Sequence, residues 1–217
     1  TVVDTRNLKA RLEKACIPEY QEGSLGVVRS DFGETISQVV LEQDYGTSFG
    51  YKSLRDRELI QLPGRGIDAI GLEDDGAVLT LVLGETKVSD EEKNPPQVVD
   101  KKADSLTKQH LHHLGNHTET SGKLWNVSRF CPNPEFQQAF MRACLLFDAK
   151  KWDALRLVVA CVLVRPKSKC HEKDFGKLRK TPDTVTPASI RFVIARVPGE
   201  LEATVQRWHG ILTGARP

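Results

Sequence analysis

The sequence predicts an α/β protein in which a mixed central sheet is flanked by helices, and three observations support this prediction. Two apolar runs, residues 67–72 and 77–83, are separated by a turn that contains an Asp-Gly pair, which is typical of an antiparallel hairpin. Two later runs rich in β-branched residues, 155–164 and 190–197, have the composition of strands buried on both faces. Segments with the apolar spacing of helices precede and follow these strands.

The helices are predicted from apolar residues that recur every three or four positions. One such segment opens with the capping residues Ser30 and Asp31, and its apolar side chains predict a half-buried helix over residues 30–42. The same spacing predicts helices over residues 104–114, 134–149 and 201–211, and a short amphipathic helix over residues 8–16.

Three connecting segments lack this periodicity. Residues 89–102 are polar and contain two adjacent prolines, so we expect an exposed loop. Residues 165–187 form a polar and basic connection between the last two strands. The apolar residues among 59–62, just before a proline, indicate a strand or the approach to one.

Length and composition favour one domain with a terminal extension. We expect residues 1–23 to form a helical N-terminal extension and residues 24–217 to form a single domain. The balance of 31 Lys and Arg against 29 Asp and Glu excludes a histone-like polybasic protein, but it leaves open nucleic-acid binding through a local patch. No apolar run reaches the roughly 18 to 20 residues that a membrane-spanning helix needs, so we expect no membrane partner.

The five cysteines occur at irregular spacings with no CxxC pair. This pattern argues against a disulfide framework and against a thiolate zinc site. No charged segment followed by an apolar one opens the chain, so no signal peptide is predicted. We therefore expect a cytoplasmic protein in a reducing compartment.

The residues with the clearest chemical meaning lie at neighbouring ends of the hairpin. Asp68 enters the first strand, whereas Glu85, Thr86 and Lys87 follow the second apolar run. Because side chains alternate along a strand, Glu85 and Lys87 project from one face and Thr86 from the other. A hard divalent cation held by Asp68 and Glu85 would offset the desolvation cost of these groups. The sequence therefore predicts a Mg²⁺ or Mn²⁺ site for phosphodiester hydrolysis, with the Thr86 carbonyl as a further ligand and Lys87 beside the water or phosphate.

A Glu-x-Lys pattern alone is weak evidence, as the chain itself illustrates. Glu91-Glu92-Lys93 has the same spacing but lies in a polar segment with no strand before it, so a solvated charge run explains it. For the hairpin residues, the alternative is a surface hairpin with an incidental ion pair. Their position next to apolar runs argues against this alternative.

This arrangement resembles the PD-(D/E)XK nuclease superfamily. The shared features are an Asp at the start of a hairpin, a Glu-x-Lys at its end and a preceding helix that bears a Glu. The resemblance implies a restriction-endonuclease-like core with Asp68, Glu85 and Lys87 as catalytic residues. The family's helical Glu corresponds to Glu34, an auxiliary catalytic residue, with Glu42 as the fallback. The proline that the family often places before the Asp is absent here, at a position that varies within the superfamily.

More narrowly, three segments are similar to HamA, the nuclease subunit family of the bacterial Hachiman anti-phage defence system. They are Arg-Ser-Asp-Phe-Gly-Glu (29–34), Gly-Arg-Gly-Ile-Asp-Ala-Ile-Gly (64–71) and Leu-Gly-Glu-Thr-Lys (83–87). This resemblance implies a Mg²⁺-dependent deoxyribonuclease that acts on DNA. It also implies a helicase-type, HamB-like partner subunit that keeps the nuclease inactive until activation. The alternative is a catalytically silent module that keeps the nuclease fold and docks a DNA-processing partner, although all the site residues are intact.

A histidine-rich segment follows the hairpin. Many related nucleases carry a Gln-x-x-x-Tyr helix that supports the site, and Gln109 with His113 has this spacing, with His in the aromatic place. The alternative for Gln109 is a solvated helix face. A metal site is one interpretation of the four histidines His110, His112, His113 and His117. However, the Gly-Asn pair before His117 indicates that the helix ends there. We therefore expect these histidines to form an exposed helix end.

Basic residues are dense in the connection 165–187 and include Lys167 and Lys169. If this connection folds near the hairpin, these lysines would contact phosphates and contribute sequence-independent, salt-dependent affinity. A solvated loop is the alternative. The sequence contains no helix-turn-helix, zinc-finger or RNP signature for reading bases.

Overall fold

The computed structural model describes residues 26–50, 66–76, 78–131 and 133–214. The predicted extension 1–23, the predicted helix 8–16 and the apolar residues 59–62 lie outside the described residues.

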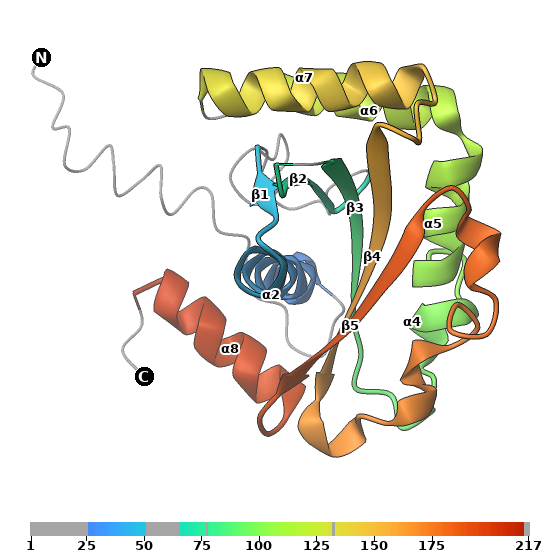
Figure 1. Cartoon of the computed structure of the whole chain (residues 1–217). Coiled ribbons are helices and arrows are strands. Elements are labelled where there is room, and N and C mark those ends of the chain that lie inside the picture. Colours follow the sequence, from blue (N-terminus) through green and yellow to red (C-terminus); the bar gives the residue numbers. More distant parts are fainter. Residues whose placement is uncertain (1–25, 51–65, 77, 132, 215–217) are drawn as a thin grey trace, which may run out of the picture.

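Five strands form one mixed sheet in the order β1-β2-β3-β4-β5 (Figure 1). The pairs β1–β2 and β2–β3 are antiparallel, whereas β3–β4 and β4–β5 are parallel. The predicted α/β class with a mixed central sheet flanked by helices is confirmed. The strands are β1 (Ser48–Phe49), β2 (Ala69–Asp74), β3 (Leu79–Val88), β4 (Leu155–Pro166) and β5 (Ser189–Val197).

The predicted hairpin is the pair β2–β3. Its turn is held by two side chains, since Asp74 accepts a hydrogen bond from the Gly76 N–H and Asp75 accepts one from the Val78 N–H. Gly76 has a φ of 80°, a left-handed conformation that glycine adopts without steric cost. Turn chemistry therefore sets the register of the two strands.

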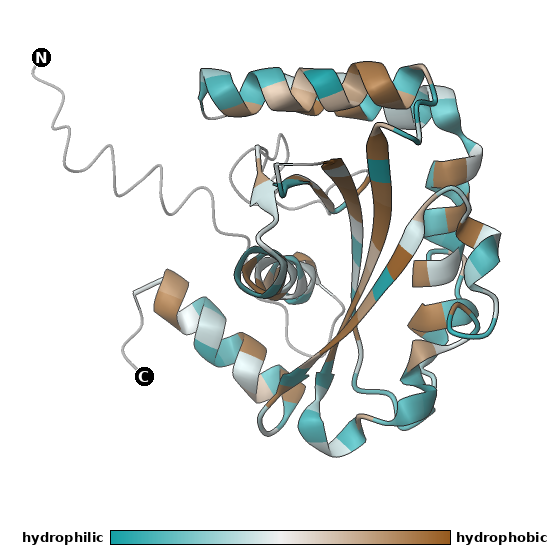
Figure 2. Cartoon of the chain, in the orientation of Figure 1, coloured by the Kyte–Doolittle hydropathy of each residue, from teal (hydrophilic) through white to brown (hydrophobic). Residues whose placement is uncertain are grey.

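Helices cover both faces of the sheet (Figure 1). One face packs against α2 (Val27–Tyr45) and α8 (Leu201–Leu212), and the other packs against the helices that connect β3 to β4. These connecting helices are α4 (Gln97–Asp100), α5 (Leu106–Gly115), α6 (His117–Ser128) and α7 (Pro134–Asp148). Apolar residues follow the strands and the inner faces of the helices, as Figure 2 shows. No helix in the described ranges is long and apolar enough to cross a membrane.

Two features of this connecting region were not predicted. The segment 89–102 was expected to be an exposed loop, but it contains α4, whose Val98 and Val99 are buried. Helix α6 was not predicted at all, because its first seven residues are polar or Gly and its apolar residues are clustered at its C-terminal end, so no helical period is visible. Both helices pack on the side of the sheet that carries Glu85, and they therefore bear directly on the candidate site.

The prediction that both late strands are buried on both faces is correct for β4 and wrong for β5. Strand β4 lies between two parallel neighbours and is buried along nearly its whole length. Strand β5 is the edge of the sheet, and most of its side chains are only half-buried. The segment 190–197 contains two arginines among its eight residues and 155–164 one among ten, a difference that the prediction did not weigh.

The connection 166–188 contains three short 3-10 helices: η1 (Lys167–Lys169), η2 (Glu172–Phe175) and η3 (Pro182–Val185). Although its sequence is polar, this region contributes Asp174 to an ion pair with Arg165 of β4 in which both side chains are fully buried. The four cysteines in the described ranges are free thiols.

Helix α2 approaches β3 closely at Gly33. A Cβ atom at this position would lie 2.3 Å from Val88 Cγ2 and 3.3 Å from Thr86 Cγ2. We expect Gly33→Ala to lower the free energy of unfolding by about 1 to 3 kcal/mol, because overpacking forces the neighbouring side chains or backbone to shift. The measurement is urea denaturation followed by circular dichroism.

Gly122→Ala in α6 is the matched control for this prediction. No atom of the described residues lies within 4 Å of a Cβ at Gly122, so alanine should raise the stability by about 0.5 to 1 kcal/mol. An unchanged midpoint for Gly33→Ala would show that helix and strand are not in close contact.

Candidate active site

Two carboxylates face each other across the hairpin. The antiparallel register pairs Ala69 with Gly84, and its continuation by one residue places Asp68 opposite Glu85. Side chains that are directly opposite in such a pair have Cβ atoms about 4.5 to 5.5 Å apart. The Thr86 backbone N–H donates a 2.8 Å hydrogen bond to Asp68 Oδ2, which holds this side chain against β3.

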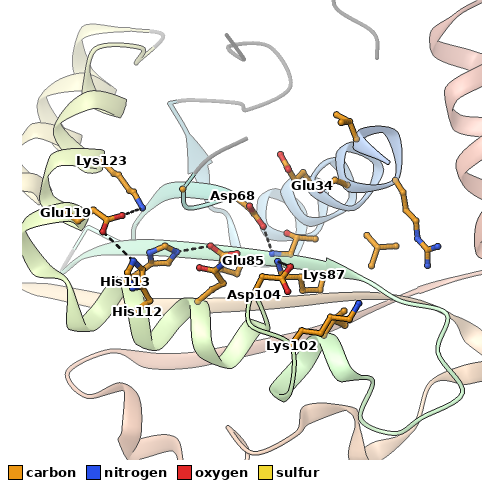
Figure 3. Close-up of a pocket in the computed structure, with 18 residues that line it drawn as sticks. Glu34, Asp68, Glu85, Lys87, Lys102, Asp104, His112, His113, Glu119 and Lys123 are labelled. Atoms are coloured by element: carbon orange, nitrogen blue, oxygen red, sulfur yellow. Dashed lines mark hydrogen bonds and ion pairs between the residues drawn. The ribbon is translucent and has the colours of Figure 1, made fainter. Parts of the chain in front are cut away.

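Lys87 lies beside this pair. It is two residues after Glu85 in β3 and therefore projects from the same face, as Figure 3 shows. Its Nζ is 3.5 Å from Asp104 Oδ2, and its side chain is 18% exposed. The sequence-predicted trio of Asp68, Glu85 and Lys87 is thus brought together by the hairpin.

Burial is the largest influence on both carboxyl groups. It raises the pKa of Glu85 to about 7, although the positive charge of Lys87 acts in the opposite direction. Burial, and then the neighbouring charge of Glu85, raise the pKa of Asp68 well above its ordinary value. Ionising both buried carboxyl groups at once is unfavourable, because the two negative charges repel each other and lose their hydration. A divalent cation bound between them would offset this cost.

The helix α2 contributes Glu34 to the same pocket. Glu34 is 5% exposed, and its negative charge raises the pKa of Glu85. Figure 3 shows Glu34 next to Asp68. The fallback residue Glu42 lies two turns further along α2 and is not among the residues that line the pocket.

Helix α5 places Gln109 and His113 at the pocket, whereas a solvated helix face was the alternative for Gln109. The expectation of an exposed helix end is wrong for two of the four histidines, since His110 is 0% and His113 is 2% exposed. Burial lowers the pKa of His110 to about 3 and that of His113 to about 4, so both rings are neutral at neutral pH.

The break predicted between His113 and His117 is present, because α5 ends at Gly115 and α6 begins at His117. The His117 ring stacks on Phe147, with centroids 4.6 Å apart. It is therefore part of the packing between helices.

The carboxylates open into a pocket of about 510 Å³. Besides Lys87, three cationic side chains line it: Arg29 from α2, Lys102 after α4 and Lys123 from α6. Among the described lining residues, acidic side chains outnumber basic ones by one, and a bound divalent cation would reverse this balance. The pocket would then attract an anionic substrate such as a phosphodiester.

The donor set fits Mg²⁺ or Mn²⁺. In the described part of the chain, no three His, Cys, Asp or Glu side chains are grouped as a complete metal site, so the protein side chains offered are Asp68 and Glu85. Mg²⁺ is usually held by one or two carboxylates and keeps several waters or takes substrate phosphate oxygens. Thr86 supplies its N–H to Asp68, which places its backbone next to the predicted metal ligands.

The lysines predicted to bind nucleic acid lie elsewhere. Lys167 and Lys169 are in η1, after β4, and are not among the residues that line the pocket. Lys169 Nζ is 2.9 Å from Glu92 Oε1 and donates to the Asp90 carbonyl, so its charge is already paired. The connection does fold beside the segment that follows β3, but it does so through these contacts with acidic residues.

Sequence reasoning missed the cations Arg29, Lys102 and Lys123. The helix that bears Lys123 was not predicted, so the position of this lysine at the pocket could not be expected. The contact of His113 with the site could be found from its spacing to Gln109, although the expectation of an exposed helix end pointed the other way.

Comparisons with known proteins do not identify a relative of this chain. No family model matches it. No curated protein and no solved structure matches it either. A function for the chain is therefore inferred from its own residues and their geometry.

Proposed function

We propose that this protein is a metal-dependent nuclease that hydrolyses phosphodiester bonds in DNA. The observation that carries the proposal is the buried Asp68–Glu85 pair, with Lys87 on the same face of the hairpin and three further cationic side chains around the pocket. Neither carboxylate is paired with a cationic side chain at hydrogen-bonding distance in the described residues. A divalent cation is the partner that this pair lacks.

The chemistry follows from the roles that these residues can perform. Asp68 and Glu85 would hold the cation, which when bound activates a water and stabilises the charge that develops on the phosphate. Lys87 supplies a fixed positive charge next to the two carboxylates, where it can stabilise the transition state. Glu34 adds a further carboxylate at the edge of the pocket. Arg29 is ion-paired with Asp90 at 2.8 Å, and Lys123 with Glu119 at 2.7 Å. Together with Lys102, these two side chains line the pocket and would attract the backbone of the nucleic acid.

The fold supports an assignment to the PD-(D/E)XK superfamily. An antiparallel hairpin that bears the acidic pair, two parallel strands beside it and a preceding helix that bears Glu34 are the arrangement that the resemblance implies. The three segments similar to Hachiman nuclease subunits all border this pocket. We therefore include anti-phage defence in the proposal, with a helicase-type, HamB-like subunit that restrains the nuclease until activation.

The test is cleavage of supercoiled plasmid and linear duplex DNA by the purified chain, alone and with a candidate helicase-type subunit. Reactions contain Mg²⁺, Mn²⁺ or EDTA. We expect metal-dependent cleavage that Glu85→Gln reduces to the level seen with EDTA, because the substitution removes a ligand charge. Glu42→Gln is the control, since Glu42 is on α2 but outside the pocket, and it should cleave like the unmodified chain.

Each outcome has a distinct meaning. Cleavage that survives Glu85→Gln would move the chemistry away from the hairpin. Absence of cleavage under every condition, together with tight binding of the helicase-type subunit, would favour the catalytically silent module.

A further inference from the structure

A buried hydrogen bond connects helix α5 to one of the two carboxylates. His113 Nε2 lies 2.9 Å from Glu85 Oε1, and the two side chains are 3% and 2% exposed (Figure 3). An ionised carboxylate can only accept hydrogen bonds, so this contact requires the proton of the neutral imidazole to be on Nε2. The histidine is therefore the donor whenever Glu85 carries its charge.

The His113 ring has no other polar partner in the part of the chain that the structure describes. Its Nδ1 is buried without a hydrogen bond, so the contact with Glu85 is the polar interaction that this ring makes. Its backbone is also held in place, because Thr120 Oγ1 in α6 donates a 2.7 Å hydrogen bond to the His113 carbonyl. The ring is thus presented to Glu85 by two packed helices.

The hydrogen bond restricts how Glu85 can be oriented. One carboxylate oxygen, Oε1, is occupied by His113, and Asp68 lies opposite Glu85 in the register of the hairpin. A rotation of the carboxylate that moves Oε1 away from His113 Nε2 would break this hydrogen bond. Hydrogen bonds of this kind to metal-ligating groups typically contribute 10- to 100-fold to metal affinity.

We propose that His113 is a positioning residue that orients Glu85 for divalent-cation binding by donating a hydrogen bond from Nε2 to Oε1. This inference rests on the proposed function, because it assumes that Glu85 is a metal ligand. It gives His113 a specific atom-level role, whereas the Gln-x-x-x-Tyr comparison implies only that this helix supports the site. The role of His113 is indirect, and it acts on the reaction through Glu85.

The chain offers a matched control for the loss of a buried histidine. His110 is on the same helix, one turn earlier, and is fully buried. No described hydrogen bond joins it to Asp68 or Glu85, and it does not line the pocket. His110→Leu therefore reports the cost of replacing a buried imidazole on α5 without altering the contact with Glu85.

The experiment measures Mn²⁺ binding to the full chain by isothermal titration calorimetry, in the absence of DNA. We expect His113→Leu to weaken Mn²⁺ binding about 10- to 100-fold. His113→Gln, whose amide can donate to the carboxylate, should recover much of the affinity, whereas His110→Leu should bind like the unmodified chain. His113→Met provides a second apolar variant with a side chain that adapts to irregular gaps, in case His113→Leu does not fold.

The outcomes separate this inference from the function on which it rests. If the unmodified chain binds Mn²⁺ and the folded apolar variants at His113 bind it equally well, the positioning role is overturned and the proposed nuclease site stands. If His110→Leu weakens binding as much as His113→Leu, the effect is general to α5 and the positioning role is again overturned. If the unmodified chain binds no Mn²⁺ while folded, both proposals are overturned.

Discussion

Lys87→Met is expected to slow DNA cleavage about 10²- to 10³-fold in kcat while leaving the protein folded. Methionine keeps the apolar part of the side chain but removes the charge next to Asp68 and Glu85, which both respond electrostatically to Lys87. The effect should appear mainly in kcat, because a charge that stabilises the developing phosphate charge acts most strongly in the transition state.

Lys93→Met is the matched control for this substitution. Lys93 belongs to the second Glu-x-Lys sequence of the chain, but its side chain is exposed and does not line the pocket. Single-turnover cleavage with Mg²⁺ compares the two variants. Equal rates for both would remove Lys87 from the proposed chemistry, and a loss confined to KM would assign it to substrate binding.

Arg165→Met is expected to lower the free energy of unfolding by about 3 to 5 kcal/mol, because it leaves a buried carboxylate without its counter-charge. Arg165 Nη1 is 2.7 Å from Asp174 Oδ1, and both side chains are 0% exposed. Arg165 also donates to Asn94 Oδ1 at 3.1 Å, so it connects the end of β4 to the segment that follows β3. The measurement is the urea midpoint together with the slope of the transition.

The double substitution Arg165→Met with Asp174→Leu distinguishes charge loss from a general loss of packing. Since replacing a buried ion pair by apolar residues is often nearly neutral, we expect the double variant to be more stable than Arg165→Met alone. A double variant that is as unstable as the sum of the two single variants would show that no buried unpaired charge was responsible.

The predicted elements that proved correct all depend on local patterns. Helix α2, the hairpin β2–β3 and the helix α8 have apolar residues at the period of their own secondary structure, and the hairpin adds a turn sequence. The opposition of Asp68 and Glu85 follows from the same local information, because the turn sets the strand register. This is why the core of the candidate site could be predicted before any tertiary contact was known.

The predictions that failed concern burial that depends on distant parts of the chain. Asp174, in the polar connection after β4, is fully buried against Arg165 at the end of β4. Their ion pair offsets the desolvation cost of both charges, but the neighbouring sequence of neither residue predicts this burial. His110 and His113 were expected at an exposed helix end, yet they are buried because α5 packs against the sheet as well as against the unpredicted helix α6. Polar residues can be buried when hydrogen-bond or ion-pair partners come from distant segments of the chain. The apolar periodicity of a segment does not identify those partners.

By itself, then, the sequence determined the α/β class, the hairpin and the acidic pair with its lysine, since each depends on residues within one turn or one strand pair. The tertiary structure decided which strand became the edge, which cations surround the pocket and which ring donates to Glu85. His113 and Glu85 are 28 positions apart and lie on different elements. Their contact depends on how α5 packs against the sheet, which is set by the whole core rather than by the pattern of either segment.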